Sequence, residues 1–273
     1  MIKSNKWQIG ILYFILIVLA LLYILPILSG IMISFIPGVD YLSGSLFPKS
    51  LNFENYVKAF QNANVPRMMI NSTVTSLLIV SGQLIVSSLA AYAFVFLNFK
   101  WKEPLFFIFL MTMMVPFEAT FIANFQTIKE MHLIDSYFGM ALPSLASAFS
   151  TFFLRQTFKQ IPNELIEASK VNGFNHWKIY KDVVMPISKQ SLITLGIYQF
   201  LGAWNMYLWP LLVSSNNNVR TVQIGLRQIQ SEEALTEWGV VMASAVIVAL
   251  PTLIILYLSQ KRLQEGLAEG AVK

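Results

Sequence analysis

Long runs of apolar residues alternate with short polar segments along the whole chain. Six runs approach or exceed the length of a membrane-spanning helix, which takes about 20 residues. They lie at about residues 9–36, 68–99, 104–126, 136–154, 190–213 and 238–260. Pro116, Pro143 and Pro251 interrupt the third, fourth and sixth runs, where we expect breaks or kinks. The pattern predicts an all-α integral membrane protein, one domain over residues 1–273, with six transmembrane helices.

The composition agrees with a location in a bilayer. The 273 residues are 56% hydrophobic and 12% charged, whereas soluble domains are about 25% charged. The mean hydropathy is +0.60. The chain has no cysteine and two histidines, which excludes a disulfide framework, a cysteine-based or histidine-rich metal centre and a thiol nucleophile. We therefore expect this chain to hold no metal or cofactor of its own.

Two interpretations fit the first apolar run: the core of a cleaved signal peptide, and a membrane-spanning helix. The core of a cleaved signal peptide is about 7–15 residues long. The uncharged run from Trp7 to Val39 is far longer. We therefore interpret this run as the first membrane span.

Lysine and arginine are unevenly distributed between the segments that separate the spans. With six spans, both termini lie on the same side of the membrane. If that side is the cytoplasm, the inner segments carry 13 of the 19 lysines and arginines, and the outer segments carry 6. Cytoplasmic segments of membrane proteins are rich in these residues, so the sequence favours an N-in, C-in topology. The net charge of +5 therefore reflects topology and does not indicate nucleic-acid binding.

The longest polar interruption in the second half of the chain is residues 161–187, called the elbow below, which this topology places in the cytoplasm. Pro162 suits the first position of a helix, and Gly173 suits its end because glycine adopts a left-handed backbone without strain. Asn175 is suited to cap a second short helix, which Pro186 is expected to end. The pattern thus predicts two helices joined at a glycine.

One side of the first elbow helix is small and apolar. It is made of Leu165, Ile166, Ala168, Ser169 and Val171. This side either docks on another protein or folds back on the chain's own helices.

The elbow resembles the E-A-A-x-x-x-G loop of permease subunits of binding-protein-dependent ABC importers. Glu167, Ala168 and Gly173 match that motif, and the aromatic Tyr180 and then Pro186 follow at the family's spacing. The chain departs from the pattern at three positions. Serine 169 and phenylalanine 174 stand where the family usually has alanine, and asparagine 172 stands where it usually has aspartate.

Other segments resemble the carbohydrate-uptake branch of this family, the G-type subunits of maltose permeases. They are F-F-L-R-Q-T-F at 152–158, W-N-M-Y-L-W-P-L-L at 204–212, T-E-W at 236–238 and the tail at 260–273. Together with I-D-S-Y-F-G at 134–139, they are most similar to the E-type permease subunits of glycerol-3-phosphate importers.

The resemblance implies that the elbow is a coupling helix lying in a cleft of an ATPase subunit, whose closure turns the spans from inward-facing to outward-facing. Glu167 would make an ionic contact, and asparagine 172 lacks the usual charge. The implied coupling residues are Glu164, Glu167, Ala168, Ser169, Asn172, Gly173, Trp177, Tyr180 and Pro186. The implied partners are a second permease subunit, an ATPase dimer that binds ATP and Mg, an extracytoplasmic solute-binding protein and membrane lipid, in a bacterial cytoplasmic membrane.

Glu118, Trp204 and Asn205 are candidates for the translocation path. A charged group at the centre of a bilayer costs about 2.5–3.5 kcal/mol and often marks a pathway. Glu118 equally suits the outer membrane–water interface, because it lies about 15 residues, or roughly 22 Å of helix, beyond the start of the third run. The aromatic cluster that includes Tyr207 and Trp209 suits sugar stacking or an interfacial belt. We favour the belt for those two residues and the path for Asn205, because an amide in lipid needs a partner.

The sequence thus predicts a permease subunit for a sugar or sugar-like solute, with glycerol 3-phosphate as the best single expectation and a mono- or oligosaccharide as the alternative. The chain lacks the G-x-x-x-x-G-K-[S/T] phosphate loop, so ATP hydrolysis requires a separate subunit. An intramembrane enzyme is disfavoured, because neither His132 nor His176 lies in a span and no paired carboxylates do. A membrane scaffold without transport activity is the third alternative.

Overall fold

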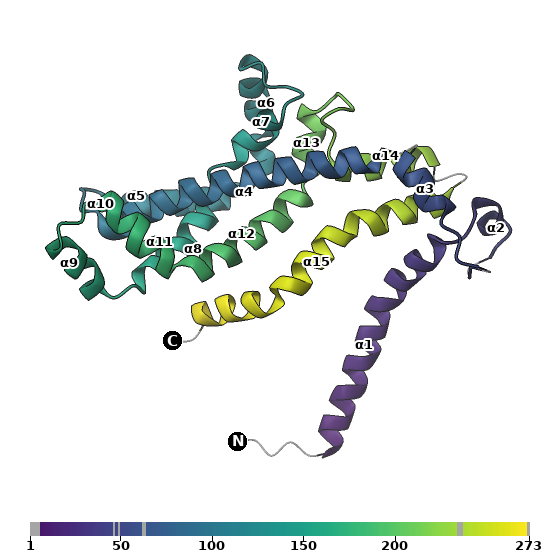
Figure 1. Ribbon diagram of the computed structural model, residues 1–273, viewed down its shortest axis with the longest axis horizontal. Coiled ribbons are helices and arrows are strands. Elements are labelled where there is room, and N and C mark those ends of the chain that lie inside the picture. The colour runs from purple at the N-terminus through teal and green to yellow at the C-terminus, as the bar shows by residue number, and fades with distance from the viewer. Residues whose placement is uncertain (1–5, 46, 49, 62–63, 234–236, 272–273) are drawn as a thin grey trace. The chain divides into compact units, whose positions relative to one another are not determined.

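The computed structural model describes residues 6–45, 47–48, 50–61, 64–233 and 237–271. All regular secondary structure of these residues is helical, as the sequence predicts (Figure 1). The chain divides into two compact units, the first made of Met1–Pro66 and Gly225–Leu250 and the second of Arg67–Ile224 and Pro251–Lys273. The motifs at 236–238 and 260–273 lie partly outside the described residues.

The first unit is built on one long apolar helix and several shorter pieces. Its helices are α1 (Lys6–Ile33), α2 (Gly38–Leu42), α3 (Glu54–Gln61), most of α14 (Val222–Glu233) and the first part of α15 (Trp238–Ala271). Within the α1 segment Trp7–Ile33, no residue of the most apolar 18-residue window is buried. Such a continuous exposed apolar surface fits contact with lipid or with another protein.

The buried amide of Asn55 joins α3 to the end of α1. Its Nδ2 donates to the backbone oxygens of Ser34 and Ile36 at 2.9 and 2.8 Å. Gly239 of α15 packs on the same amide, where a β-carbon would lie 2.2 Å from Nδ2. Only glycine therefore allows α15 to begin so close to α3.

The second unit contains the remaining helices. They are α4 (Val65–Phe96, apart from its first two residues), α5 (Lys102–Met111), α6 (Phe121–Glu130), α7 (Tyr137–Ala141), α8 (Ala148–Lys159), α9 (Asn163–Val171), α10 (His176–Ile179), α11 (Met185–Ile187), α12 (Lys189–Trp204) and α13 (Leu208–Val213). Near the α9–α10 end, α4, α8 and α12 run side by side (Figure 1) and share a core that includes Ala91, Leu154, Phe158 and Leu195.

Three helices are long and apolar enough to cross a membrane among the described residues: Trp7–Ile33, Val65–Phe96 and Trp238–Gln260. Two pairs meet the same test together but are bent. Lys102–Met114 and Phe117–Glu130 meet at 94°, and Tyr137–Ser144 and Ala148–Lys159 meet at 55°. The run at 190–213 forms α12 and α13, separated by residues 205–207. The described residues thus hold three to five candidate spans, and the predicted count of six is not confirmed.

At Pro116 the predicted third span is broken into two helices. Val115 is extended, with φ −86° and ψ 116°, and the helix turns through 94° before Phe117. Proline lacks an N–H and disfavours a helical residue before it. The segment at 104–126 is therefore two helices meeting at a sharp corner.

Trp209 lies at the centre of a second core, formed where α6, α7 and α13 gather (Figure 1). Its side chain is fully buried, and its Nε1 donates to the backbone oxygen of Met140 at 3.1 Å. The rings of Phe117 and Phe121 pack on it. The interfacial-belt interpretation is therefore wrong for Trp209, because a belt residue must reach the lipid headgroups.

Candidate functional site

The elbow forms two helices joined at a left-handed glycine. α9 ends at Val171, and Gly173 has a φ of +76°. The side chain of Asn175 caps α10 by accepting from the backbone N–H of Lys178 at 2.8 Å. The glycine end and the asparagine cap are confirmed. Pro162 precedes the first helical residue, so α9 begins one residue later than predicted.

The second half of the elbow differs from the prediction at Pro186. A π-helical turn, Tyr180–Val184, follows α10, and the chain remains helical through Pro186 to the end of α11. The prediction that Pro186 ends the helix is therefore wrong. Pro186 lies in the first turn of α11, where the missing N–H of proline is tolerated, directly after the π-helical turn.

One face of the elbow is buried against α4, α8 and α12. Ile166, Ser169, Ile179 and Tyr180 are each at most 9% exposed. The three non-serine side chains join the core that includes Phe158. The Ser169 hydroxyl donates to the Leu165 oxygen of its own helix. This inner face of the elbow gives α9 a fixed base on α4, α8 and α12.

A chain of aromatic contacts also fastens the elbow to α4. The hydroxyl oxygens of Tyr180 and Ser88 lie 2.8 Å apart. Tyr92 packs edge-on against Tyr180, with ring centroids 5.5 Å apart, and its hydroxyl lies 3.1 Å from Nδ1 of His176. Trp177 stacks on the other side of Tyr180 at 5.3 Å. Sequence reasoning missed Ser88 and Tyr92 as elbow contacts, and the polar Tyr92 within an apolar run is the signal that could have found it.

The opposite side of α9 is exposed. It is called the outer face below, and it consists of Glu164, Leu165, Glu167, Ala168, Val171 and Asn172. Val171 is 89% exposed and Leu165 is 45% exposed. In α10, Trp177 is 62% exposed. Two carboxylates thus lie on the same helix face as unusually exposed apolar side chains, a combination typical of a protein-binding surface.

The predicted coupling residues therefore separate into two groups. Ser169 and Tyr180 point toward the chain's own helices. The others are exposed: Glu164, Glu167, Ala168, Asn172, Gly173, Trp177 and Pro186. The apolar side of α9 thus packs in part on the chain's own helices and is in part exposed, and docking of another protein stays a prediction.

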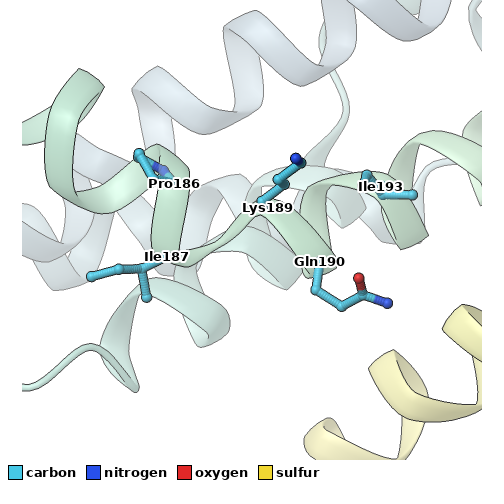
Figure 2. Close-up of a pocket in the computed structure, with 5 residues that line it drawn as sticks. All are labelled: Pro186, Ile187, Lys189, Gln190 and Ile193. Atoms are coloured by element: carbon cyan, nitrogen blue, oxygen red, sulfur yellow. The ribbon is translucent and has the colours of Figure 1, made fainter.

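An open cavity of about 450 Å³ lies where the elbow joins α12. Pro186 and Ile187 line one part of it, and Lys189, Gln190 and Ile193 line the other, along the start of α12 (Figure 2). The cavity places Pro186 at an accessible edge of the elbow.

An ion pair holds α5 to α8 near the elbow. Arg155 is only 3% exposed, and its Nη2 lies 2.7 and 2.9 Å from the two carboxylate oxygens of Glu103. Its guanidinium also lies 3.9 Å from the centre of the Phe106 ring. A charge this deeply buried needs such partners, so Arg155 fixes the position of α8, from which the elbow starts.

The three path candidates lie in different surroundings. Glu118 is exposed in the 3-10 turn Phe117–Thr120, directly after the corner at Pro116. Trp204 is 1% exposed and stacks on Phe200. Asn205 is exposed, donates to the Leu201 oxygen at 2.8 Å and accepts from Gln223 at 3.2 Å. Among the described residues, no hydrogen bond or ring contact joins Glu118 to Trp204 or Asn205.

Comparison with known proteins gives a consistent result. The sequence model of a family described as "binding-protein-dependent transport system inner membrane component" matches residues 83–269. The sn-glycerol-3-phosphate transport system permease protein UgpE of Rhizobium meliloti (strain 1021) is 31% identical over 267 residues, covering 94% of this chain and 95% of the relative. UgpE of Yersinia pestis bv. Antiqua (strain Antiqua) is 36% identical over 204 residues, covering 74% of this chain and 73% of the relative.

A solved structure shares the fold. It is a chain of a bacterial ABC transporter involved in the import of the acidic polysaccharide alginate, with a TM-score of 0.83 and 23% identity. The match covers 96% of this chain and 99% of that one.

Proposed function

Because the chain belongs to the family of inner membrane components of binding-protein-dependent transport systems, we propose that its elbow couples an ATPase to the import of glycerol 3-phosphate. The chain is a permease subunit of an ABC importer for a sugar or sugar-like solute. Relatives that are 31% and 36% identical carry the name of a glycerol-3-phosphate permease, which supports that solute. A mono- or oligosaccharide is the alternative, since the structural neighbour belongs to an alginate importer.

The proposed topology has six spans, with both termini in the cytoplasm. The corner at Pro116 and the break between α7 and α8 divide the third and fourth spans, and α12 with α13 forms the fifth. The excess of lysine and arginine in the inner segments supports this arrangement. It puts the elbow on the cytoplasmic side, where an ATPase subunit is accessible.

The observation that carries the coupling role is the division of α9 into two faces. The inner face is packed on three membrane helices, and the outer face is open. A helix fixed on one side and free on the other transmits a push from a partner to the spans without deforming. Leu165, Val171 and Trp177 would enter an apolar cleft of the ATPase. Ser169 and Tyr180 are positioning residues, because they hold the elbow and do not reach its exposed side.

Charged side chains of the outer face would orient the contact between the elbow and the ATPase. Glu164 and Glu167 lie one turn apart on the outer face, and we assign to Glu167 the ionic contact with a basic residue of the ATPase. Asn172 ends α9 and donates to the Ala168 oxygen at 2.9 Å, so its amide completes the helix end. Gly173 sets the angle at which α10 leaves α9, and Pro186 lies at the accessible edge beside α12.

The complete importer would contain a second permease subunit, an ATPase dimer that holds ATP and Mg, and an extracytoplasmic binding protein. A second structural neighbour, with a TM-score of 0.69 and 14% identity, is part of an alginate transporter in complex with a pentasaccharide-bound periplasmic protein. In this arrangement the chain is not itself catalytic. The intramembrane-enzyme and scaffold alternatives predict no dependence of ATPase binding on the elbow.

The test uses the assembled importer and a charge reversal on the outer face. Glu167→Lys should remove most co-purification of the ATPase subunit and most solute-stimulated ATP hydrolysis. Glu130→Lys is the matched control, because it reverses another exposed carboxylate, at the end of α6. Gly173→Pro should act like Glu167→Lys, since proline cannot adopt a φ of +76°. Full ATPase co-purification and uptake in both elbow variants would refute the coupling role.

The solute is tested separately. Cells that lack only this chain should lose uptake of one of three radiolabelled solutes: glycerol 3-phosphate, a hexose or a disaccharide. Loss of glycerol 3-phosphate uptake alone supports the proposal, and loss of sugar uptake alone replaces it with the alternative.

A further inference from the structure

Basic side chains gather where α4 ends and α5 begins, at the end of the second unit that carries the elbow (Figure 1). Lys100 lies in the connection between the two helices, and Lys102 is the first residue of α5. Arg155 and Lys159 of α8 both interact electrostatically with the Lys102 ammonium. These four cations are called the basic cluster below. They come from segments that are distant in sequence and meet in one small region.

One carboxylate lies within the basic cluster and offsets part of its charge. Glu103 pairs with Arg155, with Nη2 2.7 Å from a carboxylate oxygen. Lys100 and Lys159 are exposed, and neither has an ion-pair partner among the described residues. Four cations against one carboxylate leave an excess of three positive charges. Such a surface attracts an anionic partner.

Lys102 is the fixed member of the basic cluster. Its Nζ donates to the backbone oxygens of Val95 and Leu97 at 2.9 and 3.0 Å, so it satisfies carbonyl groups at the end of α4. An ammonium group has three N–H donors. The third has no hydrogen-bond partner within the part of the chain that the structure describes. A cation held in this way can receive an anionic oxygen without losing much further side-chain freedom.

The residue between the two lysines is a tryptophan in a strained backbone conformation. Trp101 has a φ of +70°, which is unfavourable for a residue other than glycine. Its side chain is 64% exposed, so packing within the chain offsets little of this strain. Tryptophan is enriched at membrane–water interfaces, where the ring contacts lipid and the N–H reaches polar groups. A position at the membrane surface would therefore account for an exposed indole beside two lysines.

Exposed apolar side chains continue from Trp101 along α5. Leu105 and Ile108 follow Trp101 by four and seven residues, which places these positions on the same side of the helix, and both are exposed. Phe107 is exposed beside them. A soluble anion would use the cations alone. A phospholipid also needs an apolar surface for its acyl chains, and this side of α5 leads directly away from the basic cluster.

We propose that the basic cluster and the adjacent side of α5 bind an anionic phospholipid. The phosphate lies among the lysines of the cluster, the indole of Trp101 lies at the level of the headgroup, and an acyl chain lies along Leu105 and Ile108. Because the cluster lies beside the elbow, the proposed topology puts this lipid in the cytoplasmic leaflet. The inference needs only that this end of the chain reaches a membrane surface, so it is independent of the proposed coupling and solute.

The experiment uses the whole importer in detergent and two lipid probes. Phosphatidylglycerol carries a net negative charge, whereas phosphatidylcholine carries none. Retention of each lipid is measured by native mass spectrometry over a range of added lipid. Lys100→Gln and Lys159→Gln should each lower the affinity for phosphatidylglycerol by about fivefold, the equivalent of about 1 kcal/mol. The affinity for phosphatidylcholine should not change.

The matched control is Lys129→Gln. Lys129 is an exposed lysine at the end of α6, outside the basic cluster, so this variant should bind phosphatidylglycerol as the wild type does. Lys102 is not substituted, because its loss would also leave carbonyl groups of α4 without a donor.

Trp101→Gly separates lipid binding from folding. This variant should bind both lipids more weakly, because the indole is lost. Its thermal unfolding temperature without added lipid should be unchanged or higher, since glycine adopts a φ of +70° without strain. A lower unfolding temperature together with unchanged lipid binding would show that Trp101 has only a structural role.

Four further outcomes would overturn the proposal. The first is equal retention of the two lipids by the wild type, and the second is an equal fall in Lys129→Gln, which would make the effect one of net charge alone. The third is loss of ATPase co-purification in Lys100→Gln or Lys159→Gln, because the cluster would then contact the ATPase. The fourth is equally tight binding of glycerophosphoglycerol, the headgroup without acyl chains, because the site would then hold a soluble anion. An importer that fails the coupling test should still retain phosphatidylglycerol.

Discussion

The hydroxyl groups of Ser88 in α4 and Tyr180 at the base of the elbow lie 2.8 Å apart in the interior. Ser88 also donates to the Ile85 oxygen at 3.0 Å, so the Tyr180 hydroxyl is the donor between the two side chains. The contact joins a membrane helix directly to the segment that we assign to ATPase coupling. In the proposed coupling, this hydrogen bond would pass motion of the elbow to α4.

Tyr180→Phe removes this hydrogen bond and leaves the ring stack intact. The loss should be about 1 kcal/mol of folding free energy, because the Ser88 hydroxyl keeps its bond to Ile85. We expect a small fall in the thermal unfolding temperature and fewer solute molecules imported per ATP hydrolysed. Tyr198→Phe is the control, since Tyr198 is 57% exposed and should change neither quantity. An unchanged transport-to-hydrolysis ratio in Tyr180→Phe would argue against this role of the hydrogen bond.

The two faces of α9 should respond differently to truncation. Ile166→Ala removes a buried side chain and should destabilise the chain by about 2–5 kcal/mol. Val171→Ala changes a side chain that is 89% exposed, so its effect on the isolated chain should stay within about 0.5 kcal/mol. Val171→Ala should nevertheless weaken ATPase binding, measured by co-purification or titration. The opposite ranking of the two variants in stability would contradict the assignment of the faces.

Arg155 should be sensitive to substitution because it is buried together with its charge. Arg155→Ala leaves Glu103 without its partner and removes the contact with Phe106. We expect a loss of roughly 0.5–3 kcal/mol of stability, because packing and hydrogen bonds are lost while the carboxylate that remains is 68% exposed and stays solvated. Glu103→Gln should cost at least as much, because it leaves the buried guanidinium of Arg155 without a charged partner. Equal unfolding temperatures for wild type and Arg155→Ala would show that the pair contributes nothing.

Gly139 is predicted to tolerate no side chain. A β-carbon there would lie 2.1 Å from the backbone oxygen of Leu133, a group that cannot move away easily. Gly139→Ala should therefore lower stability by about 1–3 kcal/mol or more through overpacking. Gly10→Ala is the control, because no atom lies within 4 Å of its β-carbon. The two variants are compared by thermal unfolding in the same detergent.

The ion pair between Lys58 of α3 and Glu237, which directly precedes α15, should break at high pH. Nζ of Lys58 lies 2.8 Å from a carboxylate oxygen of Glu237. This hydrogen bond raises the pKa of Lys58 above its ordinary value of 10.5, against the opposing effect of burial. The stabilisation is fully present below pH 10.5 and is lost as the pH rises through the pKa of the folded state. Unfolding temperatures of wild type and Glu237→Gln should therefore converge at high pH, and a constant difference would refute the coupling.

The sequence was sufficient to predict the helical fold, the elbow and its glycine because each rests on local signals. A left-handed residue favours glycine, and Asn175 meets the cap preference. The outer and inner sides of α9 could not be separated, because Ile166 and Val171 are equally apolar. Which of them is buried depends on α4, α8 and α12, which are distant in sequence.

The incorrect predictions have the same origin. Trp209 was assigned to a belt because a tryptophan near the end of a span usually reaches the interface, but α6 and α7 cover it. The sequence predicts that Pro186 ends a helix because proline is costly in a helix interior, whereas Pro186 lies in the first turn of α11, directly after a π-helical turn.

The division of α9 into an inner and an outer face has a consequence for how such importers diverge. Residues that hold the elbow to the spans and residues of the proposed ATPase contact are different side chains of one short segment. Changes at Leu165, Glu167 or Val171 can adapt the chain to a different ATPase without disturbing Ile166, Ser169 or Tyr180. We therefore expect that an ATPase subunit can be exchanged between importers while each permease keeps its own solute path.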